Sequence, residues 1–203
     1  MKDVIYRVGA VNTADLDAKL QEAHLHPDRR RRIAALSRKD AIAASLLGDH
    51  LARELAAELC GCDPQSLTVE DGQYGKPRLH GAEAEISIAH SGIYAAAAAA
   101  KRQVGIDLEK RRPISRSIPI RMFSREEQAW LDIAPDRFLD RFFRLWTMKE
   151  AYGKMRGFGI FSSRQFYARF AEGELLLLYP DCLFQFPDAP EGYYLSLCTE
   201  REK

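Results

Sequence analysis

The stretch Val104-Gly105-Ile106-Asp107-Leu108-Glu109-Lys110 alternates apolar and acidic side chains over the length of one strand. Side chains two positions apart share a face of a strand, so Asp107 and Glu109 are expected on one face and their apolar neighbours in a core. Two carboxylates held about 6 to 7 Å apart at their Cα atoms repel one another unless a cation lies between them. Oxygen ligands of this kind suit Mg²⁺ or Mn²⁺, and the alternative is a strand with a solvated acidic face.

The composition is that of a soluble globular protein. The 203 residues are 46% hydrophobic and 29% charged, a length that allows one large or two small domains. The charged sequence Met1-Lys2-Asp3 stands where a signal peptide needs an apolar run, and no later stretch reaches the roughly 18 apolar residues of a membrane span. A cytoplasmic protein without a membrane partner is therefore expected.

Charge and cysteine spacing argue against two further classes of function. The net charge of +1 does not fit a general nucleic-acid binder, although clustered arginines can still form local anion sites. The four cysteines show no Cys-x-x-Cys spacing and no companion histidines. Free thiols are therefore expected rather than a zinc site or a disulfide framework.

A basic run, Arg29-Arg30-Arg31-Arg32, leads into a long segment with apolar residues at helical spacing, which Gly61 ends. The segment predicts one or two helices, with Ser45 further along it. Four consecutive arginines cover every face of a helical turn, so a solvated helix start is one interpretation. A phosphate clamp is the other, because guanidinium groups match phosphate oxygens and a helix N-terminus favours anions.

Two short segments place polar groups where ligands often bind. In Tyr74-Gly75-Lys76-Pro77 the glycine allows close approach of the backbone, and the residue before proline is held extended. The alternating segment 85–92 puts His90 at a strand terminus. A surface turn and a structural histidine are the alternatives.

The six alanines 95–100 would form a helix by intrinsic propensity alone. Only three residues, 101–103, separate them from the acidic strand, which is the length of a hairpin connection. We therefore predict a strand that pairs with the acidic strand and presents small side chains to a closely packed layer.

The C-terminal half predicts two helices followed by strands. Phe123-Ser124-Arg125-Glu126-Glu127 is a capping-box helix start. A second helix, from about Arg137 to Met155, sets Glu150 and Lys154 four positions apart on one face, where a surface salt bridge is the alternative to a functional pair. Alternating segments over residues 165–198 are expected to complete an antiparallel sheet.

In this order the segments resemble the 4′-phosphopantetheinyl transferases of the surfactin-synthetase-activating type, over nearly the whole chain. Gly-Ile-Asp-Leu-Glu at 105–109 and Trp-Thr-Met-Lys-Glu at 146–150 are the most specific pair. The resemblance implies a pseudo-dimeric α+β fold of two similar lobes, each with an antiparallel sheet packed on helices. The N-terminal lobe, 1–103, would bind the phosphate and adenine of coenzyme A, and the C-terminal lobe, 104–203, would carry the metal site and the catalytic helix.

The resemblance also implies the roles of individual residues. The 3′-phosphate of coenzyme A would be held by Arg29, Arg32 and Ser45. The adenine would be lined by Gly75, Lys76 and Pro77, with His90 and Lys154 toward the pyrophosphate. The metal ligands and catalytic residues would be Asp107, Glu109 and Glu150, together with Lys154 as a catalytic residue. Ala89 departs from the better-known members, which have a serine before the histidine.

The chemistry fits these residue types. Attack of a serine hydroxyl on the pyrophosphate of coenzyme A needs two phosphates neutralised, which Mg²⁺ on three carboxylates can do together with Lys154 and His90. Glu150 or a metal-bound water is the expected proton acceptor. The products are 3′,5′-ADP and a carrier protein whose serine bears phosphopantetheine.

The partner is expected to be an apo acyl or peptidyl carrier protein that meets a monomeric enzyme, with no nucleic acid bound. A basic loop, Lys110-Arg111-Arg112 with Arg116 and Arg121, is a candidate surface for an acidic carrier. Two alternatives stay open: a Mg²⁺-dependent phosphohydrolase or nucleotidyltransferase, and a non-catalytic binder of coenzyme A or nucleic acid. A binder has no use for clustered carboxylates, because they repel phosphates when no metal is present.

Overall fold

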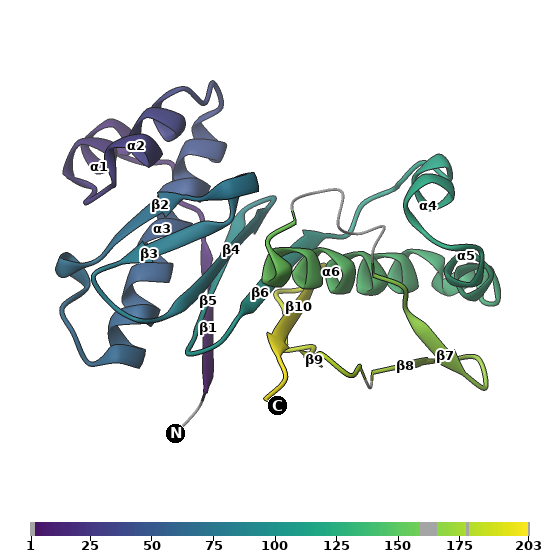
Figure 1. Cartoon of the computed structure of the whole chain (residues 1–203). Coiled ribbons are helices and arrows are strands. Elements are labelled where there is room, and N and C mark those ends of the chain that lie inside the picture. The colour runs from purple at the N-terminus through teal and green to yellow at the C-terminus, as the bar shows by residue number, and fades with distance from the viewer. Residues whose placement is uncertain (1–2, 159–165, 178, 203) are drawn as a thin grey trace.

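In the computed structural model, which describes residues 3–158, 166–177 and 179–202, two three-stranded antiparallel sheets each carry a long helix on one face. The N-terminal sheet has the order β1-β5-β4 and the C-terminal sheet the order β6-β10-β9. In Figure 1 the N-terminal sheet lies with α1 to α3 on the left and the C-terminal sheet with α4 to α6 on the right. The predicted α+β class is confirmed, whereas the division into lobes at residues 103 and 104 stays a prediction.

The N-terminal sheet is built around its alanine strand. β5 (Tyr94–Ala100) pairs with β1 (Val4–Ala10) on one side and with β4 (Glu85–Ser91) on the other. Helix α3 (Lys39–Cys60) covers one face and ends at Gly61, which has a left-handed φ of 69°. This confirms a strand for residues 95–100 in spite of their helix propensity.

All six alanines of β5 are fully buried because both faces of the strand are covered. Ala97 and Ala99 pack in the core that includes α3, whereas Ala96, Ala98 and Ala100 pack against residues of β6 and β10. The small side chains allow these layers to approach from both sides. Tertiary packing has overridden local propensity here.

The predicted pairing of the alanine strand with the acidic strand is wrong. β6 (Val104–Lys110) pairs with β10 (Tyr193–Glu200), which in turn pairs with β9 (Cys182–Gln185). Both edges of β5 are already occupied, so the three-residue connection carries the chain from one sheet to the other.

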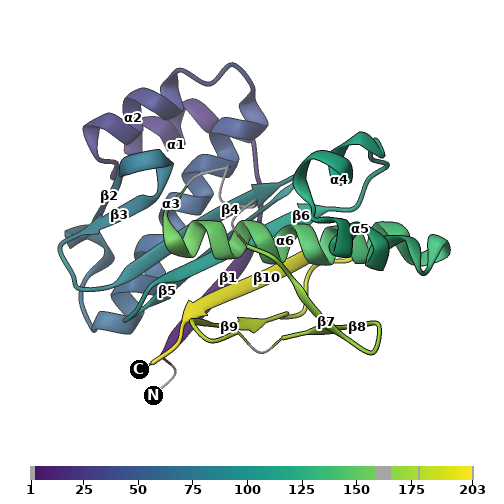
Figure 2. The same ribbon diagram turned by 45° about the vertical axis from the view of Figure 1, so that its right-hand side comes forward.

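Helix α6 (Phe138–Arg156) crosses the C-terminal sheet, as Figure 2 shows. Gly105 makes this close packing possible. A Cβ at that position would lie 1.9 Å from the Ala151 carbonyl oxygen and 2.5 Å from the Met155 nitrogen. The glycine of the Gly-Ile-Asp segment therefore sets the distance between the acidic strand and the helix that bears Glu150 and Lys154.

The remaining elements surround the two sheets. α5 begins with the predicted capping box, in which Ser124 and Glu127 exchange hydrogen bonds of 2.8 and 3.1 Å. β7 and β8 form a separate two-stranded sheet, so only part of the predicted segment 165–198 extends the C-terminal sheet, and Gln165 lies outside the described residues. All four cysteines are free, as expected. Among the described residues no helix is long and apolar enough to cross a membrane.

The other elements are α1 (Leu16–Glu22), α2 (Pro27–Ala34), β2 (Thr68–Asp71), β3 (Pro77–His80), α4 (Ser117–Met122), α5 (Arg125–Asp132), β7 (Arg169–Ala171), β8 (Glu174–Leu176) and 3₁₀ turns at Pro64–Ser66, Gln73–Gly75 and Pro135–Arg137.

Candidate active site

A cavity of about 220 Å³ lies between the loop before β3 and the C-terminal half of α6. Its lining unites five residues singled out in the sequence, which come from segments far apart in the chain: Gly75, Lys76, Pro77, Glu150 and Lys154. Ser87 and Ile88 of β4 complete one wall. The junction of the two sheets therefore holds the candidate site.

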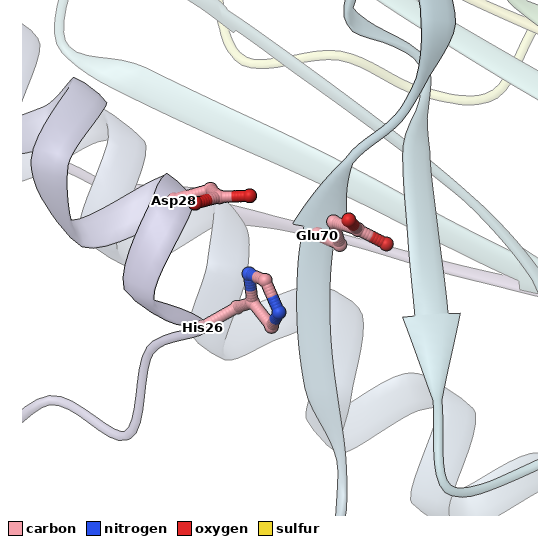
Figure 3. A group of neighbouring side chains, drawn as sticks. All are labelled: His26, Asp28 and Glu70. Carbon is pink, nitrogen blue, oxygen red and sulfur yellow. The ribbon is translucent and has the colours of Figure 1, made fainter.

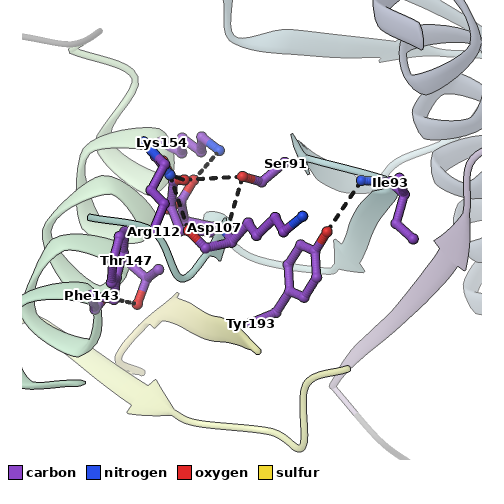
Figure 4. Close-up of polar contacts among 10 residues, drawn as sticks. Ser91, Ile93, Asp107, Arg112, Phe143, Thr147, Lys154 and Tyr193 are labelled. Carbon is purple, nitrogen blue, oxygen red and sulfur yellow. Dashed lines mark hydrogen bonds and ion pairs between the residues drawn. The ribbon is translucent and has the colours of Figure 1, made fainter. Parts of the chain in front are cut away.

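Asp107 lies at the edge of this junction with only 6% of its surface exposed. The Nζ atom of Lys154 donates a hydrogen bond to Asp107 Oδ1 at 2.7 Å, a contact that Figure 4 displays. The second carboxylate oxygen of Asp107, Oδ2, is buried and has no hydrogen-bond partner in the part of the chain that the structure describes. Burial raises the pKa of Asp107 to about 6, against the opposing effect of Lys154, and the charge of Glu109 raises it further.

Glu150 lies one turn before Lys154 on α6. Its Oε1 is buried, and within residues 3–158, 166–177 and 179–202 it has no hydrogen-bond partner. Burial first, and then the negative charge of Asp107, raises the pKa of Glu150 to about 7, while Lys154 opposes the shift. Two carboxyl groups are therefore held near each other in a setting that disfavours two negative charges.

Glu109 is already hydrogen-bonded. Its Oε2 accepts from Ser91 Oγ at 3.0 Å and from Arg112 Nη1 at 2.8 Å. Ser91 Oγ in turn accepts from the Lys110 nitrogen at 3.0 Å, so β4 and β6 meet around this carboxylate. Figure 4 shows Ser91 and Arg112 in the same group of polar contacts as Asp107.

The donor set fits a hard divalent cation. Asp107, Glu109 and Glu150 offer only oxygen ligands, and no described residue donates a hydrogen bond to Asp107 Oδ2 or Glu150 Oε1. The oxygen atoms of these three carboxylates do not all lie within 4.8 Å of one another, so they are further apart than the ligands of one ion would be. Among the described residues a different group meets this distance. Closing the shell around an ion would therefore need side-chain rotation.

That other group is His26, Asp28 and Glu70, shown in Figure 3. Asp28 forms an ion pair with Arg31, and Glu70 accepts from His80 Nε2 at 2.8 Å. Two of its three members thus have partners and all are at least partly exposed. We interpret the group as a polar network on the surface of α2 and β2.

The two arginines predicted to clamp a phosphate differ. Arg29 is 3% exposed and forms ion pairs with Asp49 at 2.8 Å and with Asp71 at 2.7 Å. Arg32 has a half-exposed side chain and pairs with Asp71 at 2.6 Å. Ser45 is buried on α3. Arg29 therefore serves the packing of α2, whereas Arg32 remains accessible to a ligand.

His90 lies at the end of β4, as predicted. Loss of water around the ring lowers its pKa, and the positive charges of Lys154, Arg32 and Arg29 lower it further. These three cations therefore lie within electrostatic reach of His90. An anion bound among them would relieve their mutual repulsion.

Lys76 has a partner that the sequence did not indicate. Its Nζ donates to the Met155 carbonyl oxygen at 2.9 Å and to Gln103 Oε1, with Glu85 at 3.5 Å. Burial lowers its pKa, against the opposing charge of Glu85. Lys76 and Met155 are 79 positions apart, so no local signal could have revealed the contact.

A buried ion pair next to Glu150 was also missed. Lys149, 1% exposed, donates to both oxygens of Glu127 at 2.8 Å and to the Phe166 carbonyl at 2.6 Å. Glu127 also accepts from the Ala168 nitrogen at 2.8 Å. The capping-box glutamate of α5 therefore anchors α6, which carries Glu150.

The basic loop is largely neutralised by contacts of its own. Arg111 pairs with Asp140, Arg112 with Glu109 and Arg116 with Asp132, at distances of 2.8 to 3.1 Å. An acidic partner would have to compete with these carboxylates. That this loop docks an acidic carrier stays a prediction.

Comparisons with known proteins define the family. The model of the 4′-phosphopantetheinyl transferase superfamily matches residues 103–177. The solved holo-[acyl-carrier-protein] synthase of Thermotoga maritima aligns with a TM-score of 0.41 and 16% identity, over 50% of this chain and 64% of that one. A 4′-phosphopantetheinyl transferase of Bacillus subtilis is 32% identical over 185 residues, which cover 87% of this chain and 83% of that protein. The 4′-phosphopantetheinyl transferase Sfp of Bacillus subtilis strain 168 is 30% identical over 86% of this chain and 82% of its own length.

The class defined by these relatives is that of group-transferring enzymes. The chain belongs to the 4′-phosphopantetheinyl transferase family, as the resemblance in the sequence predicted.

Proposed function

We propose that this protein transfers the 4′-phosphopantetheine arm of coenzyme A to a serine of an apo acyl or peptidyl carrier protein and releases 3′,5′-ADP, with Mg²⁺ held by Asp107, Glu109 and Glu150. The proposal is carried by two buried carboxylate oxygens, Asp107 Oδ2 and Glu150 Oε1, that have no hydrogen-bond partner among the described residues. Buried charged oxygens without partners are costly, and a divalent cation would satisfy both. Mn²⁺ is an alternative ion for the same oxygen ligands.

Coenzyme A would bind along the cavity. Its 3′-phosphate would meet Arg32, whose half-exposed side chain can exchange Asp71 for a phosphate, with Ser45 and Arg29 behind it. Its adenine would lie against the loop that contains Gly75 and Pro77. The pyrophosphate would then reach His90 and Lys154.

The residues of this chain divide the chemistry among them. Bound Mg²⁺ would supply neutralisation of the pyrophosphate charge. Lys154 adds a positive charge next to Asp107, and His90 can donate a hydrogen bond to a phosphate oxygen. Glu150, which would be ionised when Mg²⁺ is bound, suits the acceptance of the serine proton, either directly or through a water.

The finer features expected from the sequence stay predictions. They are a monomeric state, a cytoplasmic location, the lack of nucleic-acid and membrane partners, and the division into lobes 1–103 and 104–203. A phosphohydrolase or nucleotidyltransferase would use the same carboxylates, but family membership favours transfer.

The test is an incubation of the protein with coenzyme A, Mg²⁺ and several apo-carriers, read by intact mass. The expected result is a carrier that gains one phosphopantetheine group, with an equal amount of 3′,5′-ADP. A carrier whose acceptor serine is replaced by alanine is the control. Breakdown of coenzyme A with every carrier left unmodified would point to the phosphohydrolase instead.

A further inference from the structure

Lys76 joins the two halves of the site. It belongs to the loop before β3, on the side of the N-terminal sheet, and its Nζ donates to the carbonyl oxygen of Met155 in the last turn of α6 at 2.9 Å. The side chain is 19% exposed and also contacts Gln103 and Glu85. Its stem lines the cavity while its ammonium group is directed at the helix end.

The carbonyl oxygen of Met155 needs a hydrogen-bond donor from outside the helix. The last four carbonyl groups of an α-helix have no donor within the helix, and Met155 contributes one of them. The N–H groups of Gly157 and Phe158 both donate to the Gly153 carbonyl, at 2.9 and 3.3 Å, so neither serves Met155. A helix C-terminus also carries partial negative charge, which an ammonium group stabilises.

The backbone around Lys76 fixes the direction of its side chain. Pro77 holds Lys76 extended, with ψ at 122°, and its carbonyl accepts from the Gly72 nitrogen at 2.8 Å. Gly75 has a φ of 79°, which favours glycine. On the other side, a Cβ at Gly157 would lie 3.2 Å from Lys76 Cδ, so this glycine both ends α6 and leaves room for the lysine stem.

The contact spans the site proposed above. Glu150 and Lys154 lie within the last two turns of α6, which the Lys149–Glu127 pair and the close approach at Gly105 attach to the C-terminal side. Lys76 attaches the same turns to the loop proposed to hold the adenine. We infer that Lys76 is a positioning residue whose ammonium caps α6 across the sheet junction and holds Glu150 and Lys154 in register with bound coenzyme A. The inference rests on the proposed function of those two residues.

The experiment compares Lys76→Met, which keeps the stem and removes the ammonium, with Lys76→Arg, which keeps a charged donor. In Lys76→Met we expect kcat at saturating coenzyme A to fall by roughly 10- to 100-fold, because small displacements of catalytic groups cost this much. The calorimetric Kd for coenzyme A should stay within about twofold. Amide hydrogen exchange should accelerate at residues 154–157, which are the end of α6 and the glycine that caps it, and Lys76→Arg should restore most of kcat.

A matched control is Lys101→Met, since Lys101 also donates to a backbone carbonyl, that of Glu83 at 3.2 Å, which precedes β4 and does not belong to α6. Its kcat should equal that of the wild type. Should Lys76→Met fail to fold, Lys76→Gln replaces it, and the inference requires kcat to rank wild type, then Arg, then Gln.

Two results would overturn the inference. One is a Kd for coenzyme A that rises tenfold or more with unchanged kcat, which would make Lys76 a contact of the cofactor. The other is unchanged exchange at residues 154–157 in Lys76→Met, which would remove the cap. The exchange measurement needs no activity, so it tests the cap even if the wild type modifies no carrier and the proposed function fails.

Discussion

Lys154 Nζ lies 2.7 Å from Asp107 Oδ1, although the two residues are 47 positions apart and Glu150 lies much nearer to Lys154 in the sequence. The helical spacing of Glu150 and Lys154 predicts a pair within α6, yet the lysine turns to the strand instead. Asp107 and Glu150 each keep one buried oxygen to which none of the described residues donates a hydrogen bond. A single cation between β6 and α6 would bind both of these oxygens.

The two acidic residues should fail differently when each is changed to its amide. Asp107→Asn should weaken Mg²⁺ binding, and part of the activity should return at high Mg²⁺ or with Mn²⁺, because loss of one oxygen ligand lowers affinity first. Glu150→Gln should bind coenzyme A nearly normally and turn over about 10² to 10⁴ times more slowly at every metal concentration. Carrier modification against Mg²⁺ concentration, beside calorimetry with coenzyme A, measures both. Full recovery of Glu150→Gln by metal would reduce Glu150 to a ligand and leave a water as the base.

Metal binding should release protons near neutral pH. Each of the two carboxyl groups is mostly protonated at a pH below its own pKa in the metal-free site. At pH 6.5 Glu150, with a pKa of about 7, is therefore mostly protonated, whereas Asp107, with a pKa of about 6, is mostly ionised. Mg²⁺ needs both carboxylates, so its binding should release about one proton at pH 6.5 and almost none at pH 8.5. Titration calorimetry in buffers of different ionisation enthalpy counts the protons. The same count at both pH values would show that these carboxyl groups do not hold the metal.

The same shifts predict how the stability of the metal-free protein depends on pH. A carboxyl group with a raised native pKa stabilises the fold fully below its unfolded pKa, and this contribution is lost as the pH rises through the native value. The contribution of Asp107 should therefore disappear between about pH 4 and 6, and that of Glu150 between about pH 4.5 and 7. The Tm of the metal-free wild type should fall over this window relative to that of Asp107→Asn/Glu150→Gln, and Mg²⁺ should reduce the difference. Parallel Tm curves would contradict the shifts.

The site was predictable where local periodicity determines it. Strand alternation placed Asp107 beside Glu109, and helical periodicity gave α6 and its glycine end. The partners of these residues were not predictable, because they come from distant segments: Lys76 and Met155, which form a hydrogen bond, are 79 positions apart. The short connection 101–103 suits a hairpin and a crossing between sheets equally well, so sequence length could not decide between them.

The two arginines of the basic run should also separate. Arg32→Ala should raise the KM for coenzyme A and matter far less for 3′-dephospho-coenzyme A, because its half-exposed guanidinium can pair with the phosphate. Arg29→Ala should instead lower the free energy of unfolding by about 1 to 3 kcal/mol, because it removes one of the two arginine partners of Asp49 and of Asp71, which keep Arg53 and Arg32. Kinetics with both cofactors and denaturant unfolding measure the two effects. Equal losses with both cofactors in Arg32→Ala would place this arginine away from the 3′-phosphate.

The approach of α6 to β6 should depend on the missing side chain of Gly105. In Gly105→Ala the new Cβ would meet the Ala151 carbonyl at 1.9 Å and the Met155 nitrogen at 2.5 Å, and neither backbone atom can yield without moving the helix. We expect a loss of about 3 kcal/mol or more in the free energy of unfolding, together with weaker Mg²⁺ binding, because Glu150 would move away from Asp107. Gly9→Ala in β1 is the matched control, since its Cβ would meet the movable side-chain ends of Leu47 at 3.3 Å and of Leu51 at 3.5 Å, rather than backbone. Denaturant unfolding and Mg²⁺ calorimetry on both variants decide the matter: equal, small losses would mean that β6 and α6 do not approach so closely, and the distance between the two carboxylates would then have another cause.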